Sequence, residues 1–468
     1  MLPVNCGSHA DYQNLVVENL RKYYPNPDLL AHSTWDIIER FWHLDLSDTD
    51  TLLTHKYSKF GPAPRTPSCM QRSYLLSIDF KVSSITEWAA QLKMNPLFAI
   101  LSGFQVGDTP GVGTFYDFMK RLWDSDEPHM TSHIHPLKAK VKKPDAKGEK
   151  AASVEKVTVA ELLPQLEKTA FPLNDQPYAS LFKIYQKEFL DVSVEKGLIH
   201  KDSLALAGDG TPVVTSHRER KKRICKCKEN GINDCSCDRY FSQPDCDIGW
   251  DSSRDCFYHG YDLYMLVDSQ SDLPVFPHYS YASKHDSHGF LQAFFRMRAF
   301  LPDYKVSKVL LDSAHDAMPY YQYFKRQNIT PFIDLNGKGG RPPVYKNDFT
   351  IDKDGVPVCP SGHRMRRDGI EVAKGRMKFK CPKISHTGGC ISCTCDKPCS
   401  KAKYGRTVHL ILNDNPRLFN NPPRSSKEWK LEYNARTSAE RSNKREKLDF
   451  KLEDGRHRST KMWYCRLY

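Results

Sequence analysis

The sequence predicts an α/β protein in which a helical N-terminal region precedes a mixed five-stranded sheet. Two patterns support this fold class. Beyond residue 200, short apolar runs of strand length alternate with helical segments, and before residue 126 helical segments are separated by glycine-containing turns. The chain has 468 residues, of which 39% are hydrophobic. It is therefore long enough for two or three domains with buried cores.

The sheet is expected within residues 199–345. Its elements should follow the order β-β-β-α-β-α-β, with three antiparallel strands followed by parallel crossovers. The expected strands are 203–216, 258–268, 273–282, 305–312 and 330–336, and the expected helices are 290–302 and 318–328. This order is that of a ribonuclease-H-like core.

Residues 1–127 are expected to form a helical N-terminal domain that binds DNA. Ser84 should cap a first helix, a second should span 97–104, and Thr114 should cap a third over 115–123. Three short helices with glycine-rich turns fit a helix-turn-helix-like DNA-binding unit. They fit an ordinary helical bundle equally well.

Basic residues gather in two segments of a chain whose formal net charge is +13. The first lies in residues 128–198, which read as a basic linker followed by a helical connector over 177–196. The second is 401–468, with seventeen Lys and Arg against eight Asp and Glu. This concentration suits phosphate neutralisation and predicts double-stranded DNA as a partner. A solvated basic surface is the alternative.

Neither a membrane span nor a secretory signal is visible in the sequence. A span needs about 18 uncharged apolar residues in a row, and the first residues lack a basic stretch followed by an apolar run. We therefore expect a cytoplasmic, nucleoid-associated protein without membrane contact. Its fifteen cysteines should stay reduced there.

Two aspartates lie where apolar strands end. Asp209 lies in AGDGTP, where Gly208 and Gly210 are expected to leave room for a ligand, and Asp312 ends the run VLLD. The predicted topology places these strands side by side. The two carboxylates would then offer Mg²⁺ or Mn²⁺ the hard oxygen ligands that phosphodiester cleavage needs. Either aspartate alone is more often a structural or surface residue.

A third carboxylate, Glu440, lies in a single helix expected over 433–447. At 100° per residue, one narrow wedge of this helix contains Tyr433, Arg436, Glu440 and Lys447. The wedge suits a helix beside a catalytic centre, where Glu440 reaches metal and its neighbours hold phosphates. The alternative is a charged outer face with (i, i+4) pairs such as Glu440–Lys444.

These residues carry a resemblance to a known family. The spacing Tyr433-x2-Arg436-x3-Glu440-x6-Lys447 resembles the Y(2)R(3)E(6)K motif of cut-and-paste DDE transposases from bacterial insertion sequences. Asp209 in AGDGTPV and Asp312 in LLDSAHD resemble the first and second aspartates of that family, and Asp316 follows the second. The segment from RSYLLSIDF to GTFYDF resembles the N-terminal domain of one branch, so the likeness covers most of the chain. Many relatives have Gly-Tyr where this chain has Ala314-His315, so the chain departs from the family pattern at a position that affects local packing or a substrate contact.

The resemblance implies a transposase that binds the ends of a mobile DNA element, cleaves them and joins the 3′ ends to target DNA. Asp209, Asp312 and Glu440 would hold Mg²⁺ or Mn²⁺. The residues expected to contact DNA are Tyr433, Arg436, Lys447, Lys444 and Trp429. Trp429 has two alternative roles at this point: stacking on an unpaired base, or ordinary packing in the core. A homodimer on DNA is expected because two element ends must be held together.

Two groups of cysteines predict structural zinc, which prefers four tetrahedral sulfur or nitrogen ligands. One lies in a cysteine-rich insertion expected over 346–425, before the closing helix and tail at 426–468. Its candidate ligands are Cys359, His363, Cys381, Cys390 and Cys393, with His363 and Cys381 as alternatives for one position. The other group follows the first strand, beside the basic run HRERKKR, and consists of Cys225, Cys227, Cys235 and Cys237. Reduced thiols without metal are the alternative for both groups.

Two rival functions remain open at this point. One is a different nuclease of ribonuclease-H-like fold, which would share the carboxylates but would not need the wedge formed by Tyr433, Arg436 and Lys447. The other is a transposon-derived, zinc-containing protein that binds DNA without cutting it. All three acids are present, so this second rival requires a defect elsewhere in the chain.

Overall fold

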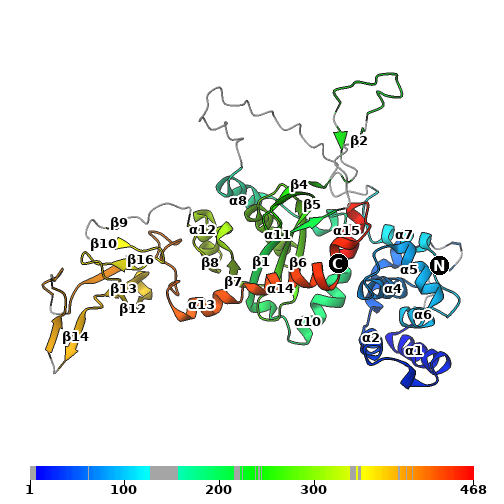
Figure 1. The fold of residues 1–468 in the computed structure, drawn as a ribbon, viewed down its shortest axis with the longest axis horizontal. Coiled ribbons are helices and arrows are strands. Elements are labelled where there is room, and N and C mark those ends of the chain that lie inside the picture. The colour runs from blue at the N-terminus through cyan, green and yellow to red at the C-terminus, as the bar shows by residue number, and fades with distance from the viewer. Residues whose placement is uncertain are drawn as a thin grey trace.

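The computed structural model shows a mixed α/β protein with a helical N-terminal region (Figure 1). It describes residues 7–126 and 157–468, apart from positions 59, 62, 216–221, 224, 238, 241–242, 244, 338–343, 346–348, 388–389, 397 and 403. The expected linker therefore lies mostly outside the described residues. Within them, no helix has the length and apolar content needed to cross a membrane.

The N-terminal region consists of short helices packed on one another. They are α1 (His9–Tyr23), α2 (His32–His43), α3 (Ser47–Leu53), α4 (Pro67–Asp79), α5 (Ile85–Met94), α6 (Pro96–Ser102) and α7 (Val112–Arg121). As expected, Ser84 caps α5 by accepting the Glu87 N–H. The expected cap at Thr114 is wrong. Gly111 precedes the helix in an extended conformation and its carbonyl accepts the Thr114 N–H, so α7 begins at Val112.

The central sheet has six strands in the order β4-β5-β1-β7-β8, with β6 also paired to β5. The strands are β1 (Leu204–Val214), β4 (Asp247–Asp251), β5 (Cys256–Asp268), β6 (Pro274–Tyr281), β7 (Val306–Leu311) and β8 (Thr330–Ile333). β1 runs antiparallel to β5 and parallel to β7, and β7 runs parallel to β8. Five strands match the expected segments. The expected total of five is wrong because β4, whose ends are aspartates, pairs with the first part of β5.

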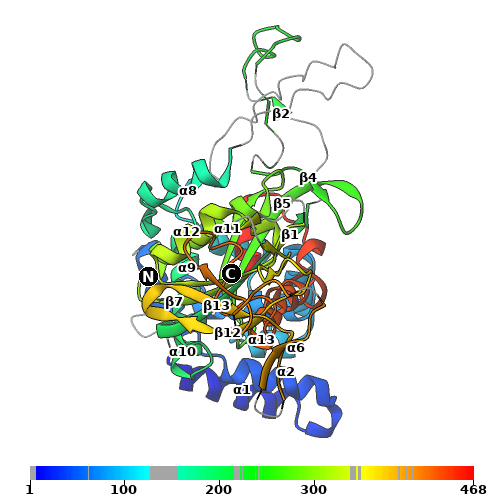
Figure 2. The ribbon, with the colours of Figure 1, turned by 90° about the vertical axis from the view of Figure 1, so that its left-hand side faces the viewer.

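Helices cover the sheet and link the central strands. α11 (Asp286–Phe300) joins β6 to β7 and packs against β1, β5 and β6, and α12 (Met318–Arg326) joins β7 to β8. The expected connector helix is present as α9 (Ala179–Tyr185), a π-helical stretch and α10 (Val192–Glu195). It is preceded by α8 (Val159–Lys168), which lies against α11 and α12 (Figure 2).

One apolar core joins the N-terminal helices to the sheet. The last helix, α15 (Thr460–Leu467), lies between them in Figure 1. The ring of Tyr464 is 5.7 Å from that of Trp123 at the end of the helical region and 5.2 Å from that of Tyr279 in β6. Trp463 beside it is fully buried and donates its indole N–H to Gln243 at 3.0 Å. The C-terminal helix therefore contributes core side chains to both parts.

A β-rich segment with its own apolar cluster lies between β8 and the final helices. Its strands are β9 (Val344–Tyr345), β10 (Phe349–Ile351), β11 (Pro357–Val358), β12 (Arg366–Glu371), β13 (Arg376–Lys380), β14 (Ile384–Thr387), β15 (Cys390–Cys393) and β16 (Thr407–Ile411). In Figure 1 it extends from the side of the sheet opposite the N-terminal helices. Asp316 ties its two ends to the core, because its carboxylate accepts the Arg417 guanidinium at 2.8 and 2.6 Å and the Asn336 N–H at 2.7 Å.

The segment that carries the Tyr-Arg-Glu-Lys spacing forms two helices, α13 (Lys427–Asn434) and α14 (Thr437–Lys444), followed by a π-helical turn over Arg445–Asp449. The expectation of one regular helix over 433–447 is therefore wrong. Tight i→i−3 bonds, such as the Arg436 N–H to the Tyr433 carbonyl at 2.9 Å, replace the regular pattern at the junction. The backbone stays in the right-handed helical region there, so Figure 1 shows α13 and α14 in close succession.

Candidate functional site

Asp209 and Asp312 lie side by side on two parallel strands, Asp312 just after the end of β7 and Asp209 in the middle of β1, so the expectation that Asp209 lies at a strand end is wrong. The pairing of β1 with β7 sets Ala207 opposite Leu310, and each aspartate comes two residues later in the chain. Their neighbours in the sheet are buried apolar residues, so the strands hold both carboxylates in place. The sequence prediction that these two strands are adjacent is confirmed.

The glycines on either side of Asp209 are required by packing, which corrects the expectation that they leave room for a ligand. A Cβ on Gly208 would lie 2.9 Å from the ring of Tyr264. A Cβ on Gly210 would lie 2.8 Å from Oδ1 of Asp286. Glycine therefore lets a buried ring and a further carboxylate approach the strand on both sides of Asp209.

Burial and neighbouring acids raise the pKa of Asp209 to about 7. After burial, the largest contribution comes from Asp286, and Asp312 and Glu440 add to it, whereas Arg436 opposes it. Asp286 is the first residue of α11, and Asp262 of β5 lies beside it. Burial and Asp286 raise the pKa of Asp262 well above its ordinary value. Sequence reasoning missed both of these acids.

A buried histidine holds Asp312. Nδ1 of His315 is 2.6 Å from Oδ1 of Asp312, and Nε2 is 2.9 Å from the hydroxyl of Tyr264. Burial would raise the pKa of Asp312, but the His315 hydrogen bond and charge, with help from the Ala314 N–H and Arg436, keep it below its ordinary value. His315 therefore keeps Asp312 ionised and fixes its orientation.

Arg436 connects Glu440 to the two aspartates. Its guanidinium donates to Oε1 of Glu440 at 2.5 Å, and its charge acts on both Asp209 and Asp312. Asn443, one turn further along α14, donates to Oδ2 of Asp209 at 3.3 Å. The structure thus brings the three predicted carboxylates into one electrostatic group beside β1 and the end of β7. The three acids do not all lie within 4.8 Å of one another, and Glu440 is ion-paired to Arg436. Within the described part of the chain, the four cysteines described below are the one group of potential metal ligands found within 4.8 Å of one another.

The other residues expected to contact DNA have different surroundings. Lys447 donates to the Pro212 carbonyl at 2.7 Å and lies 3.2 Å from Glu453, so it fastens the π-helical turn to β1. Lys444 is exposed. Tyr433 is half-buried and its ring stacks 4.6 Å from that of Trp429.

Trp429 is 5% exposed and packs near Phe332 of β8. Its indole N–H is buried without a hydrogen-bond partner among the described residues. The structure thus places this ring in the core, which is the packing alternative, and leaves its face unavailable for an unpaired base.

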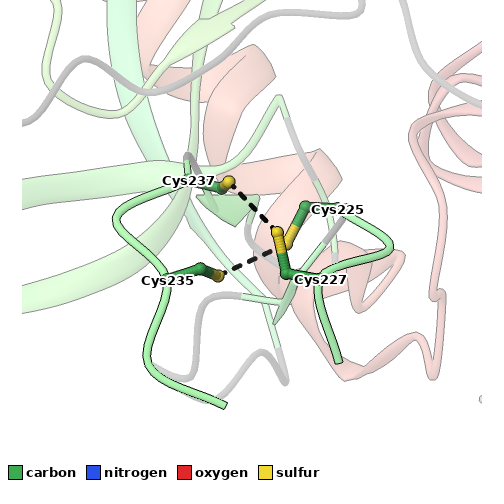
Figure 3. Close-up of side chains that lie close together, drawn as sticks. All are labelled: Cys225, Cys227, Cys235 and Cys237. Atoms are coloured by element: carbon green, nitrogen blue, oxygen red, sulfur yellow. Dashed lines mark hydrogen bonds between the residues drawn. The ribbon is translucent and has the colours of Figure 1, made fainter. Parts of the chain in front are cut away.

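A separate group of four thiols lies in the loop between β1 and β4 (Figure 3). The sulfur of Cys225 is 3.4 Å from that of Cys235, and the sulfur of Cys227 is 3.6 Å from that of Cys237. These separations are too long for disulfides. They are close to the roughly 3.8 Å between sulfurs that surround zinc tetrahedrally at a Zn–S distance of about 2.3 Å. The predicted cluster can therefore hold a metal such as zinc.

A short hairpin brings the two Cys-x-Cys pairs together. β2 (Lys222–Arg223) pairs with β3 (Arg239–Tyr240) on either side of the loop, and the Ile232 N–H donates to the Cys227 carbonyl at 2.8 Å in the turn. None of the four cysteines is fully buried. The Cys227 N–H, followed by the neighbouring thiols, lowers the pKa of Cys225 to about 7, whereas the thiols of Cys237 and Cys225 raise the pKa of Cys227 to about 12. A bound cation would stabilise all four as thiolates and would give this loop the cross-link that its small core lacks.

In the insertion, Cys359 and Cys381 are buried. The pKa of Cys399 is raised by burial and by the nearby thiols of Cys359 and Cys381. Cys399 is therefore a neighbour of the predicted ligands that sequence reasoning left out of the set. His363 accepts the Cys359 N–H through its backbone carbonyl, at 3.0 Å. The side chains of Cys390 and Cys393 lie outside the described residues, although both positions belong to β15.

The Cys225–Cys237 hairpin predicts a measurable zinc content. Substituting Cys227 and Cys237 together with serine should lower the zinc bound per chain by about one, because a site with two thiolates loses most of its affinity. Elemental analysis of purified protein checks this, with Cys256→Ser as the control because Cys256 is exposed in β5 outside the cluster. An unchanged zinc-to-protein ratio in the double variant would show that these thiols hold no metal.

The raised pKa of Asp209 predicts a pH-dependent penalty on stability. Its carboxyl keeps a proton up to about pH 7 in the folded chain but only to its ordinary 3.8 when unfolded, so wild-type stability should fall as pH rises from about 4 to 7. Asp209→Asn should therefore stabilise the protein at pH 8 by about 1 kcal/mol or more, and have little effect at pH 4. Thermal unfolding at both pH values measures this. Asp202→Asn is the control because its side chain is 78% exposed, and a destabilising effect of Asp209→Asn at pH 8 would contradict the explanation.

Comparison with known proteins gives no relative for this chain. No family model, no curated protein and no solved structure matches it. Its function must therefore be inferred from the carboxylate and thiol groups themselves.

Proposed function

We propose that this chain is a metal-dependent DNA transposase of the DDE type, which cleaves the ends of a mobile element and joins the 3′ ends to target DNA. The observation that carries the proposal is the convergence of Asp209, Asp312 and Glu440 around Arg436. These acids come from β1, the end of β7 and α14, so widely separated parts of the sequence supply one charged group. Acids gathered in this way are typical of sites whose task is chemical rather than structural.

The sheet topology supports the proposal. Along the sheet the strands follow the order β6-β5-β1-β7-β8, with the first three antiparallel and the last three parallel. In chain order within the sheet, without β4, this is 3-2-1-4-5, the arrangement expected of a ribonuclease-H-like core. Its first and fourth strands are the ones that place Asp209 and Asp312 next to each other.

The chemistry of the carboxylates suits a divalent cation, which would have to draw the three acids closer than they lie in the free chain. Asp209 is largely buried and is repelled by Asp286, Asp312 and Glu440, with Arg436 opposing that repulsion. Carboxylate oxygens are the ligands that Mg²⁺ and Mn²⁺ prefer, and Asp209, Asp312 and Glu440 would hold the ion. When bound, the metal supplies the charge that activates the attacking oxygen and stabilises the leaving oxygen of the phosphodiester.

The protein residues around the acids have separate tasks. His315 orients Asp312, and Asn443 does the same for Asp209. Arg436 neutralises Glu440 in the free protein, and its guanidinium is positioned to pair with a DNA phosphate once Glu440 turns to the metal. Lys444 adds an exposed charge on the same helix, and Tyr433 places its half-buried ring next to Arg436.

The proposal includes double-stranded element ends and target DNA as partners, and a homodimer when DNA is bound. A nuclease with the same carboxylates would cut DNA but would not join its 3′ ends to a second molecule. A strand-transfer assay distinguishes the two activities. A zinc protein that only binds DNA would show neither.

The role of Glu440 can be tested directly. With Mg²⁺ or Mn²⁺ and DNA carrying the ends of the element that encodes this chain, Glu440→Gln should lower the cleavage rate at least about a hundredfold, because the site loses one ionic metal ligand. DNA binding, measured by a mobility shift, should persist. Glu428→Gln is the matched control, since Glu428 is exposed in α13 away from the acids. Cleavage by Glu440→Gln at the wild-type rate would exclude the assigned role.

A further inference from the structure

A cavity of about 400 Å³ lies beside the carboxylate group, between α8, β6 and the first turns of α11. This volume is within the range of pockets that hold small organic molecules. Gly289 of α11 lines the cavity, and a Cβ there would lie 3.4 Å from a carboxylate oxygen of Asp262. The cavity and the acids therefore share the N-terminal part of α11, although the residues that line the cavity are different from the acids.

Among the described residues, the cavity is lined by cations and by no carboxylate. Lys284, just before α11, and Arg296, in its third turn, both line it. Neither forms an ion pair with a carboxylate of the described residues. Arg296 instead donates to its helix neighbour Gln292 and lies over the ring of Phe171 at 4.7 Å. Uncompensated positive charge in a concave site favours an anionic ligand.

A buried polar group in the same wall lacks a partner. His278 of β6 lines the cavity and is 6% exposed, and its Nδ1 has no hydrogen-bond partner among the described residues. An unsatisfied buried group of this kind costs stability unless a ligand or water completes it. Burial, followed by the charge of Arg296, lowers the pKa of His278 well below its ordinary value. The imidazole is therefore neutral and offers one hydrogen bond to a ligand.

The rest of the wall combines apolar and aromatic residues with neutral polar ones such as Gln165, Gln176 and Gln292. Leu162 of α8, Pro177 and Tyr281 line the cavity together with the cations. Lys284 lies 6.0 Å from the centre of the Tyr281 ring, so a cation and an aromatic surface stand next to each other. A ligand that binds both the cations and the aromatic surface must carry an anionic group and a flat, partly apolar ring.

We propose that this cavity binds a single nucleotide. Its phosphate lies between Lys284 and Arg296, its base lies against Tyr281 and Pro177, and His278 bonds to a polar atom of the ligand. The same chemistry belongs to a free nucleotide and to an unpaired nucleotide of a DNA strand. Binding requires neither divalent metal nor the cleavage acids, so it stands or falls separately from the proposed transposase activity.

The test is calorimetric titration without divalent metal, using thymidine 5′-monophosphate, thymidine, inorganic phosphate and a ten-residue oligothymidylate. The nucleotide or the oligonucleotide should bind at least about tenfold more tightly than thymidine or phosphate, because only these ligands satisfy both walls. Lys284→Gln and Arg296→Gln should each weaken that binding about tenfold or more, since each removes a charged contact to phosphate. Lys284 is exposed, so its variant keeps the test valid if Arg296→Gln unfolds.

Two matched controls carry the same charge change outside the cavity. Lys305→Gln controls for Lys284, because Lys305 is 73% exposed, and Arg298→Gln controls for Arg296, because Arg298 lies in the same helix and bonds to Tyr323 and Gln327. Both should retain affinity within about twofold. If the cavity variants weaken the mononucleotide, the site takes free nucleotides; if they weaken only the oligonucleotide, it takes a nucleotide within a strand. Unchanged affinity in both cavity variants, or phosphate binding as tight as nucleotide binding, would overturn the proposal.

Discussion

Repulsion among the carboxylates gathered around Asp209 of β1 is the constraint on which the rest of the site depends. The register of β1 with β7 sets Asp209 beside Asp312, and α11 adds Asp286 against the same strand. Burial makes the ionised form of Asp209 still less favourable, and both effects together raise the pKa of Asp209. Arg436 offsets part of it, and that residue is available only because α14 lies across β1 and β5. A group of acids that destabilises the fold indicates a functional role, and we propose that this role is cation binding, which carboxylate ligands suit.

The surrounding contacts show how the fold maintains this arrangement. Lys447 fastens the end of the α14 segment to the Pro212 carbonyl, so the helix that carries Glu440 is tied to the strand that carries Asp209. The ion pair between Asp316 and Arg417 joins the end of the insertion to the core. The long β-rich segment is therefore anchored between β8 and α13. The insertion has its own apolar cluster and the cysteine hairpin has its own thiols.

Apolar runs such as LALA and KVLL are long enough to be read as strands, so the sheet and the adjacency of Asp209 and Asp312 could be predicted. The symmetric Cys-x-Cys pairs were likewise readable, because their spacing brings four thiols together in a hairpin. The sequence did not reveal that Asp262 and Asp286 belong to the site. An acid inside the strand YHGYDLYMLVD and an acid at the start of a helix both have ordinary local explanations. Their importance comes from burial beside Asp209, which no local pattern reveals. The role of His315 was not predicted either, since one of its two partners, Tyr264, lies far away in the chain on β5.

Binding of Mn²⁺ to the free protein tests the central claim most directly. Calorimetry at pH 7 in two buffers with different ionisation heats measures both the affinity and the protons released. If the acids hold the ion, binding should release about half a proton per ion at pH 7, because the pKa of Asp209 is about 7 and its carboxyl is about half protonated before the metal arrives. Asp209→Asn should then bind at least about tenfold more weakly and release none. Equal affinity and equal proton release in wild type and Asp209→Asn would contradict the account.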